Sequence, residues 1–452
     1  MYRVSPAVWL APFLVTLVVV VLELFPIARQ PGVPAFQQDW VWPVDHSQCS
    51  SVAFSSFQPW ARQNAGSPRV YPSAWWPPLV AGMLCEIDPH AGLIICLACI
   101  LMLVGLGAAA LARQLGCGVG ASCIASITYL ANPLILNKLE AGHWPYVAGC
   151  GMLAFAAYLA LRSKTPVTWL AMGAIMGIGG AQLQFLPMGI AIVWAIAIAR
   201  RNAAELMQAA LATVVAAAIT APQWLPALIM GTQALDVLLP MRHWELSQSV
   251  DPTRTFRLLG YIGFYDARLI APWVQGLLWL LPAGALAGLI VRRRDPTVWA
   301  FAVLAVAGGL AAMGLRGPLA PEIDWTFGHV RGAALFRELY DALALTALGM
   351  SVLTGVAIHH ARNASGRAIA YSGAGLLAAA CVVVAARTTV GIPMYAPSNA
   401  TRADIAEIAR VADDRRYLPY PDANPLATGG VEIGGYSPFS LPIGSHPSSG
   451  DS

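Results

Sequence analysis

The strongest constraint on this chain is a series of long apolar stretches whose interiors are almost free of charge. Each comes close to the ~20 residues that a helix needs to cross a bilayer, and Glu23 is the one charged residue in their interiors. With 57% hydrophobic and 11% charged residues, the composition is not that of a soluble domain. We therefore predict an all-α polytopic membrane protein with about 11 transmembrane helices. The predicted spans are 7–28, 90–112, 119–136, 145–161, 167–181, 185–199, 206–230, 271–291, 297–315, 339–358 and 368–386.

The charges outside these spans are sorted by side. Every second connector is short and basic, and the positive-inside rule places these connectors, together with Arg3, in the cytoplasm. The long loops between them and the C-terminus then face outward. Arginine far outnumbers lysine, which suggests a bacterium, so we expect an integral protein of the inner (cytoplasmic) membrane. The positive charge belongs to the connectors, so no nucleic-acid partner is expected. The basic connector residues are Arg113; Arg162 and Lys164; Arg200 and Arg201; Arg292, Arg293 and Arg294; Arg362 and Arg367.

The segment 166–199 tests this topology, because it is too long for one span and has Lys164 before it and Arg200 after it. Basic residues on both flanks require an even number of crossings. Two short helices that turn on the outer side, near Gln182 and Gln184, meet this requirement. The alternative, one tilted helix, would reverse the sidedness of everything that follows. The first span is too long for a signal peptide and has no cleavage site, so we interpret it as an uncleaved anchor.

Most carboxylates and histidines lie in four outer stretches. At the shortest of them, a junction between two helices, Lys138, Glu140 and His143 supply a cation, a carboxylate and an imidazole. Such polar loops over an apolar bundle suit chemistry on a lipid-linked substrate, whose chain stays in the bilayer while its head group reaches the loops. The alternative is that these charges only keep the loops solvated. The four stretches are 29–89, 137–146, about 231–270 and about 316–338.

The eight cysteines fall mainly in the predicted spans. Cys96 and Cys99 have CxxC spacing, but their place inside an apolar helix favours small packing residues over a metal or redox site. Cys49 and Cys85 both lie in the first outer loop. A disulfide between them is permitted there, although spacing alone does not establish the pairing.

Four short motifs follow one another on the predicted outer side of the membrane region, roughly 1–390. They are Asp39-Trp40-Val41-Trp42-Pro43, Asn132-Pro133, Gly142-His143 and Leu335-Phe336-Arg337-Glu338. Together they resemble landmarks of the large GT-C-type membrane glycosyltransferases, especially the YfhO-like and arabinofuranosyltransferase-like branches. The last motif departs from the family pattern, which commonly continues with proline and a nearby basic residue. Here Leu339, Tyr340 and Asp341 follow.

The resemblance implies a GT-C-like enzyme that moves a sugar from a polyprenyl-phosphate-linked donor, held in membrane lipid, to a hydroxyl of an extracytoplasmic glycan or glycolipid. Asp39, with Asp45 as the nearby substitute, would be the general base that takes the proton of this hydroxyl. Cations would stabilise the leaving phosphate; the candidates are Arg337, Arg331, His143 and Lys138. The substrate cavity would include Trp40, Trp42, Glu140, Gln182, Gln184, His329 and Glu338.

Each of these assignments has a structural alternative. Asp39 could cap a short helix or pair with Arg29, His143 could cap the fourth span, and Arg337 and Glu338 could form an ion pair. No cofactor is expected. A divalent metal held by His143, His243 and His329 is a lesser possibility, because these histidines lack the spacing of a metal site.

Two other function classes remain open. A transporter or flippase of a lipid-linked glycan should bury ionisable residues near the middle of the bilayer and show broken helices or repeats. The sequence shows neither clearly, which favours the enzyme. A non-catalytic scaffold for envelope assembly is the third interpretation, and the altered residues after Arg337 keep it open.

The tail 391–452 differs from the membrane region. Residues 403–414 have the pattern of a short amphipathic helix, and the stretch around 429–435 is typical of a strand and turns. This segment is too short to bury a core by itself. We expect a small extracytoplasmic segment that packs on the outer loops or belongs to a larger outer domain.

Overall fold

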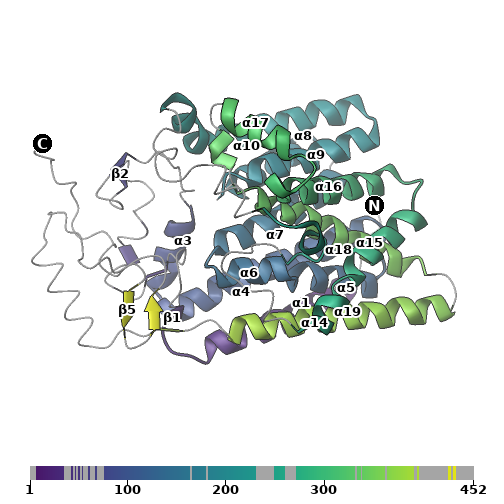
Figure 1. The fold of residues 1–452 in the computed structure, drawn as a ribbon, viewed down its shortest axis with the longest axis horizontal. Coiled ribbons are helices and arrows are strands. Elements are labelled where there is room, and N and C mark those ends of the chain that lie inside the picture. The colour runs from purple at the N-terminus through teal and green to yellow at the C-terminus, as the bar shows by residue number, and fades with distance from the viewer. Residues whose placement is uncertain are drawn as a thin grey trace, which may run out of the picture.

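The computed structural model is a bundle of helices (Figure 1). It describes residues 7–34, 42–43, 46, 49–50, 53, 60–61, 67–68, 76–162, 165–179, 182–230, 249–259, 271–330, 333–336, 338–361, 364–390, 394–395, 426–428 and 431–433. Statements about structure below refer to these residues.

A helix lies at each of the predicted spans. Eight segments are long and apolar enough to cross a bilayer, and the shorter helices α8, α9 and α16 occupy the other three predicted spans. The all-α polytopic fold is therefore confirmed, while the number of crossings stays a prediction. The helices are α1 (Ala7–Ala28), α3 (Trp76–Cys85), α4 (Pro89–Gln114), α5 (Val119–Leu130), α6 (Pro133–Glu140), α7 (Trp144–Arg162), α8 (Pro166–Gly179), α9 (Phe185–Arg200), α10 (Ala203–Met230), α13 (Pro252–Thr255), α14 (Pro272–Leu277), α15 (Leu280–Val291), α16 (Pro296–Ala312), α17 (Ala320–His329), α18 (Leu343–His359) and α19 (Ala364–Val390), with 3-10 turns η3 (Gly314–Arg316), η4 (Ala333–Phe336) and η5 (Leu339–Ala342).

The hairpin predicted for 166–199 is confirmed. Helix α8 ends at Gly179 and α9 begins at Phe185, and the turn between them contains Gln182 and Gln184. The backbone N–H of Phe185 donates to the carbonyl of Gln182 at 3.0 Å, which closes the start of α9. Both helices then return the chain to the side on which α8 began.

The Asn132-Pro133 motif explains why the third span is broken into α5 and α6. The buried Asn132 side chain accepts hydrogen bonds from the backbone N–H groups of Leu134 and Ile135, at 3.0 and 3.2 Å. Proline at the first helical position has no N–H that would need a partner. The motif therefore starts a new short helix at the point where α5 ends.

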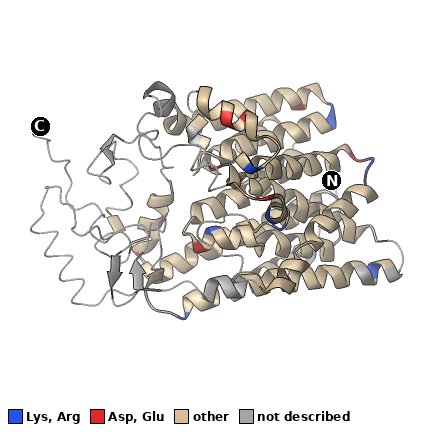
Figure 2. Cartoon of the chain, viewed as in Figure 1, with Lys and Arg blue, Asp and Glu red and all other residues tan. Residues whose placement is uncertain are grey.

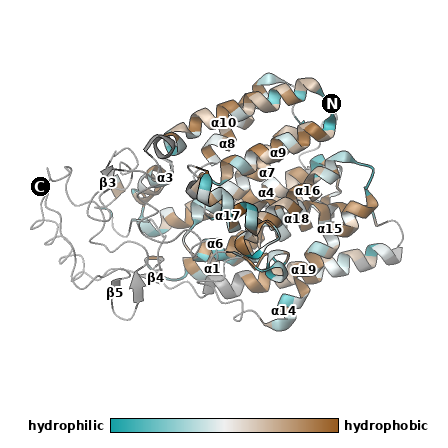
Figure 3. Cartoon of the chain, turned by 45° about the horizontal axis from the view of Figure 1, so that its top comes forward, coloured by the Kyte–Doolittle hydropathy of each residue, from teal (hydrophilic) through white to brown (hydrophobic). Residues whose placement is uncertain are grey.

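Small residues let the helices of the bundle approach closely. Gly107 and Gly151 face each other's helices in the α4–α7 contact, and Gly288 of α15 lies against the backbone of Leu353 in α18. A side chain at any of these positions would collide with the neighbouring helix. Close backbone approach of this kind is how helices gain packing energy in lipid, where the surrounding chains are as apolar as the interface. In Figure 3 the helices are largely brown, and teal is concentrated at connectors and around α17.

The basic connectors gather at one end of the bundle, which we call the basic end. Figure 2 shows blue residues of the connectors at the end where the N-terminus lies. Arg292 donates to the carbonyl of Leu115 at 2.5 Å, and the N–H of Gly118 donates to Nδ1 of His359 at 3.0 Å, so three connectors meet there. This grouping is what the positive-inside prediction requires. The side of the membrane on which the basic end lies stays a prediction.

The first loop and the tail start from the opposite end. Cys49 and Cys85 form a disulfide, with 5.5 Å between their Cα atoms, which ties the loop to α3. Strand β1 (Val33–Pro34), after α1, pairs antiparallel with β4 (Met394–Tyr395), after α19. The start of the tail therefore lies beside the start of the first loop. The described residues contain two further antiparallel pairs, β2 (Trp60–Ala61) with β3 (Ser67–Pro68) and β5 (Leu426–Thr428) with β6 (Val431–Ile433). The helix predicted at 403–414 lies outside the described residues.

Candidate functional site

The site is built at the turn between α6 and α7, at the end of the bundle opposite the basic end. Gly142 has a φ of +82°, a left-handed conformation that glycine adopts without strain. The turn lets the N–H of His143 donate to the carbonyl of Lys138 at 2.8 Å. This turn brings the His143 ring back toward the Lys138 side chain. The Gly142-His143 motif is thus a helix-ending turn that joins two of the predicted site residues.

The ammonium group of Lys138 is the centre of the site. It forms an ion pair with Asp341 in η5, with 2.6 Å between Nζ and Oδ1, and the two side chains are only 4% and 1% exposed. Lys138 Nζ also lies 3.0 Å from the hydroxyl of Tyr340 and 3.2 Å from Nδ1 of His143.

Two aromatic rings complete the surroundings of this ammonium. It lies 4.2 Å from the ring centre of Tyr340 and 4.4 Å from that of Tyr146, within the range of cation–π attraction. The hydroxyl of Tyr146 donates to the backbone carbonyl of Asp341 at 2.7 Å. Burying a charge is expensive unless it is paired. Here the carboxylate of Asp341 and the ring of Tyr340 come from η5, and the ring of Tyr146 comes from α7. The contacts of Lys138, which belongs to α6, therefore hold these three elements together.

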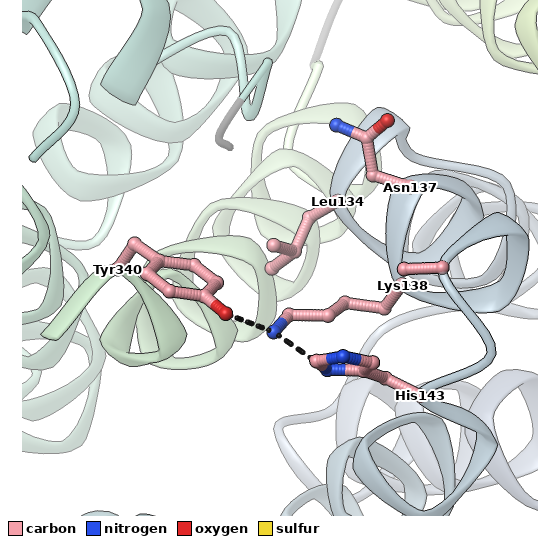
Figure 4. Close-up of a pocket in the computed structure, with 6 residues that line it drawn as sticks. Leu134, Asn137, Lys138, His143 and Tyr340 are labelled. Carbon is pink, nitrogen blue, oxygen red and sulfur yellow. Dashed lines mark hydrogen bonds between the residues drawn. The ribbon is translucent and has the colours of Figure 1, made fainter. Parts of the chain in front are cut away.

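A small pocket opens beside Lys138. Figure 4 shows the Lys138 side chain extending between Tyr340 and His143, while Asn137 points away from this contact. The free space is about 10 Å³, room for roughly one water molecule. A sugar phosphate does not fit in a space of this size without movement of the walls. The lining residues are Leu134, Asn137, Lys138, Ala141, His143 and Tyr340.

The first loop is anchored beside this turn by tryptophans. The rings of Trp42 and Trp76 meet the buried ring of Trp144 edge-on, with centroid distances of 6.1 and 5.9 Å. The indole N–H of Trp42 donates to the carbonyl of Pro89 at 2.7 Å, and that of Trp76 donates to the carbonyl of Ile178, also at 2.7 Å. Since Trp144 follows His143 directly, these contacts hold the loop against the site. Trp42 is itself buried, so its ring supports the fold here.

The structure brings together three of the predicted site residues. Lys138 contacts His143 directly, and the Tyr340 hydroxyl donates to Oε2 of Glu338 at 3.4 Å, which connects Glu338 to Lys138 through Tyr340. Glu140, Gln182 and Gln184 are half-buried near the same end of the bundle. Asp39, Trp40, Asp45, Arg331 and Arg337 lie outside the described residues.

His329 has a different environment. Its ring is exposed on α17 and stacks on the ring of Trp325 at 5.0 Å, with Nδ1 2.8 Å from the Trp325 carbonyl. Helix α17 buries none of its side chains. His329 therefore belongs to a separate exposed surface, and its place in the substrate cavity stays a prediction.

Sequence reasoning missed Tyr340, Asp341 and Tyr146. A signal was present, because Asp341 is a carboxylate near the start of an otherwise apolar span, and such residues mark functional or paired positions in membranes. The buried Lys138–Asp341 pair lies just beyond the end of one predicted span and near the start of another, so Glu23 stays the one charged residue in the interiors of the predicted spans. Glu23 is indeed buried, at 1% exposure, and neither of its carboxylate oxygens has a hydrogen-bond partner among the described residues.

One group of side chains has the proximity of metal ligands. His46, Cys49 and Glu86 place ligand atoms within 4.8 Å of one another. Cys49 is bonded to Cys85, however, and a disulfide sulfur is not a thiolate ligand. Two exposed side chains remain, which is too few for a tetrahedral site. The group does not include the histidines singled out from the sequence.

The long apolar helices define the class of protein: an all-α polytopic membrane protein. The structure is similar to the cryo-EM structure of the arabinofuranosyltransferase AftD from mycobacteria, with a TM-score of 0.61 and 13% sequence identity. The match covers 90% of this chain and 29% of that chain, so the chain spans about three tenths of the length of that protein. No protein-family model and no curated protein matches the sequence.

Proposed function

We propose that the chain is a membrane glycosyltransferase that moves a sugar from a polyprenyl-phosphate-linked donor to a hydroxyl of an extracytoplasmic glycan or glycolipid. The observation that carries this proposal is the fold, which over 90% of the chain is similar to that of an arabinofuranosyltransferase. The apolar bundle suits a donor whose prenyl chain stays in lipid. The buried cation of Lys138 and the half-buried imidazole of His143, at one end of the bundle, suit a phosphate that must leave with negative charge.

Asp39 is the proposed general base, with Asp45 as the substitute. An acceptor hydroxyl is a poor nucleophile until a carboxylate takes its proton. Asp39 precedes Trp42 by three residues, and three residues of chain reach at most about 11 Å. Because Trp42 is anchored on Trp144 beside His143, chain length permits the carboxylate to act at this turn.

The leaving phosphate is assigned to His143 with Arg331 and Arg337. Arginine suits this role because its planar guanidinium binds two phosphate oxygens at once. Lys138 contributes positive charge, but a phosphate oxygen would have to compete with Asp341 for direct contact with its ammonium. Glu338 lies within this group, since it accepts a hydrogen bond from Tyr340.

The test is transfer of radiolabelled sugar from polyprenyl-phosphate donors in membranes that contain the protein. Asp39→Asn should lower the rate of sugar transfer by about 10²-fold or more, because the general base is lost. Asp88→Asn is the matched control, since Asp88 only caps α4 through the N–H of Ala91 and asparagine caps equally well. Transfer that survives both Asp39→Asn and Asp45→Asn rules out this assignment of the base.

A transporter or flippase of the lipid-linked glycan is the second candidate. The buried Lys138–Asp341 pair and the buried Glu23 favour it, because ionisable groups inside a bundle often mark a transport path. The same assay separates the two functions. A transporter moves labelled lipid across the membrane and leaves the sugar on its carrier, whereas a transferase moves the label to the acceptor.

A further inference from the structure

We propose that Lys138 serves the reaction through His143: Lys138, Tyr340 and Asp341 hold the His143 ring with its proton on Nε2, and this N–H recognises an anionic oxygen. The inference rests on the proposed function in one respect, that the oxygen belongs to the donor phosphate. Lys138, Tyr340 and Asp341 are then positioning residues, and His143 is the residue that touches substrate.

The first step of the argument is a count of donors and acceptors. A lysine ammonium has three N–H groups and no acceptor. Three acceptor atoms lie within 3.2 Å of Lys138 Nζ, namely Oδ1 of Asp341, the hydroxyl oxygen of Tyr340 and Nδ1 of His143. The ammonium is therefore surrounded by as many acceptor atoms of the protein as it has N–H groups, and another anion would have to displace one of them.

The second step concerns the histidine. In neutral imidazole one ring nitrogen donates and the other accepts, and the partner of one nitrogen decides the state of the other. Because Lys138 has only donors to offer, Nδ1 of His143 must accept at 3.2 Å. The ring proton is then on Nε2. His143 is a neutral donor in this arrangement, without a second positive charge beside the ammonium.

The third step is the orientation of Tyr340. Its single hydroxyl proton is directed to Oε2 of Glu338 at 3.4 Å, so its oxygen accepts from Lys138. These hydrogen bonds run outward from the ammonium, to Glu338 through Tyr340 on one side and to His143 on the other. Tyr146 also donates to the backbone carbonyl of Asp341, which ties η5 to α7, the helix that begins directly after His143.

The experiment is ¹⁵N NMR of the histidine-labelled full-length protein in lipid nanodiscs, which distinguishes protonated from unprotonated ring nitrogens. The signals of His143 are assigned as those lost in His143→Gln. In the wild type we expect a protonated Nε2 and an unprotonated Nδ1. In the double variant Lys138→Met with Asp341→Asn, which removes both charges and leaves no buried ion unpaired, we expect this single state to be lost. The control Arg254→Met, at a partly exposed ion pair with Asp251, should leave the signals unchanged.

A wild-type ring protonated on Nδ1, or on both nitrogens, would overturn the inference. So would an unchanged His143 spectrum in the double variant. This measurement needs no turnover, which separates it from the proposed function. If the spectra are as expected but the protein transfers no sugar, the proposed enzymatic function is wrong and the tautomer assignment stands. If transfer is normal but the tautomer differs, the tautomer assignment is wrong and the enzymatic function stands.

Discussion

The ammonium of Lys138 and Oδ1 of Asp341 lie 2.6 Å apart, with both side chains almost completely buried. The pair joins a residue just after one predicted span to the start of another, and its ammonium lies 3.2 Å from Nδ1 of His143. It therefore links the stability of the bundle to the geometry of the proposed site.

Removing one member of this pair should destabilise the fold strongly. Lys138→Met leaves the Asp341 charge buried and unpaired, so we expect a loss of about 3–5 kcal/mol. Adding Asp341→Leu should recover much of that loss, because no charge then remains to be desolvated. Thermal unfolding in detergent, followed by tryptophan fluorescence, gives the order of the variants. Arg254→Met breaks a partly exposed pair and should cost about 1 kcal/mol or less. If the double variant unfolds at the same temperature as Lys138→Met or at a lower one, an unpaired Asp341 charge is not the cause of the loss.

His143 should tolerate glutamine better than asparagine. The terminal amide of glutamine can place an N–H near the position of Nε2, whereas that of asparagine stands closer to Nδ1. If Nε2–H binds the leaving phosphate, asparagine should lower sugar transfer by about 10²–10³-fold, as loss of one oriented donor does elsewhere. Glutamine should retain several-fold more transfer. Equal transfer by the two variants would argue against a role for Nε2.

Gly142→Ala should impair transfer through backbone geometry. Alanine at a φ of +82° costs about 1–2 kcal/mol, and relief of this strain would move His143 away from Lys138. Gly116→Ala is a matched control, since Gly116 has a φ of +85°, has open space around it and lies in a connector at the basic end. Both variants should lose similar stability, but only Gly142→Ala should lose transfer. A parallel loss of transfer in both would show that general destabilisation is responsible.

The two ends of the bundle should lie on opposite sides of the membrane. A membrane-impermeant thiol reagent should label Glu322→Cys, on the exposed helix α17, in intact spheroplasts. It should label Arg293→Cys, in a basic connector, only after permeabilisation. The unsubstituted protein gives the background from its native thiols. Labelling with the two positions reversed would invert the topology and remove the outward-facing site.

The disulfide predicts a count of thiols. Denatured protein should take up six maleimide groups before reduction and eight after it, because Cys49 and Cys85 are joined and the other six cysteines are free. Mass spectrometry of the intact protein reads both numbers. Cys49→Ser should give seven adducts under both conditions. Eight adducts without reduction would show that the native protein lacks this disulfide. The bond would then give no support to an oxidising compartment around the first loop.

The membrane helices and the grouping of the basic connectors at one end of the bundle followed from the sequence alone. Stretches such as 206–230 and 271–291 are recognised by length and absence of charge, which are local properties, and the hairpin near Gln182 followed from the basic residues on its flanks. Asn132-Pro133 and Gly142 are local signals of the same kind, since the cap and the left-handed turn depend only on their own residue types.

Only the tertiary structure decided what surrounds the Lys138 side chain. Its partners Tyr340 and Asp341 come from a segment more than 200 residues away, and no periodicity or spacing connects two such segments. The anchoring of Trp42 on Trp144 and the pairing of Cys49 with Cys85 depend in the same way on how the helices pack. Length and charge select the spans because lipid acts on each segment separately, whereas the site arises where separate segments meet.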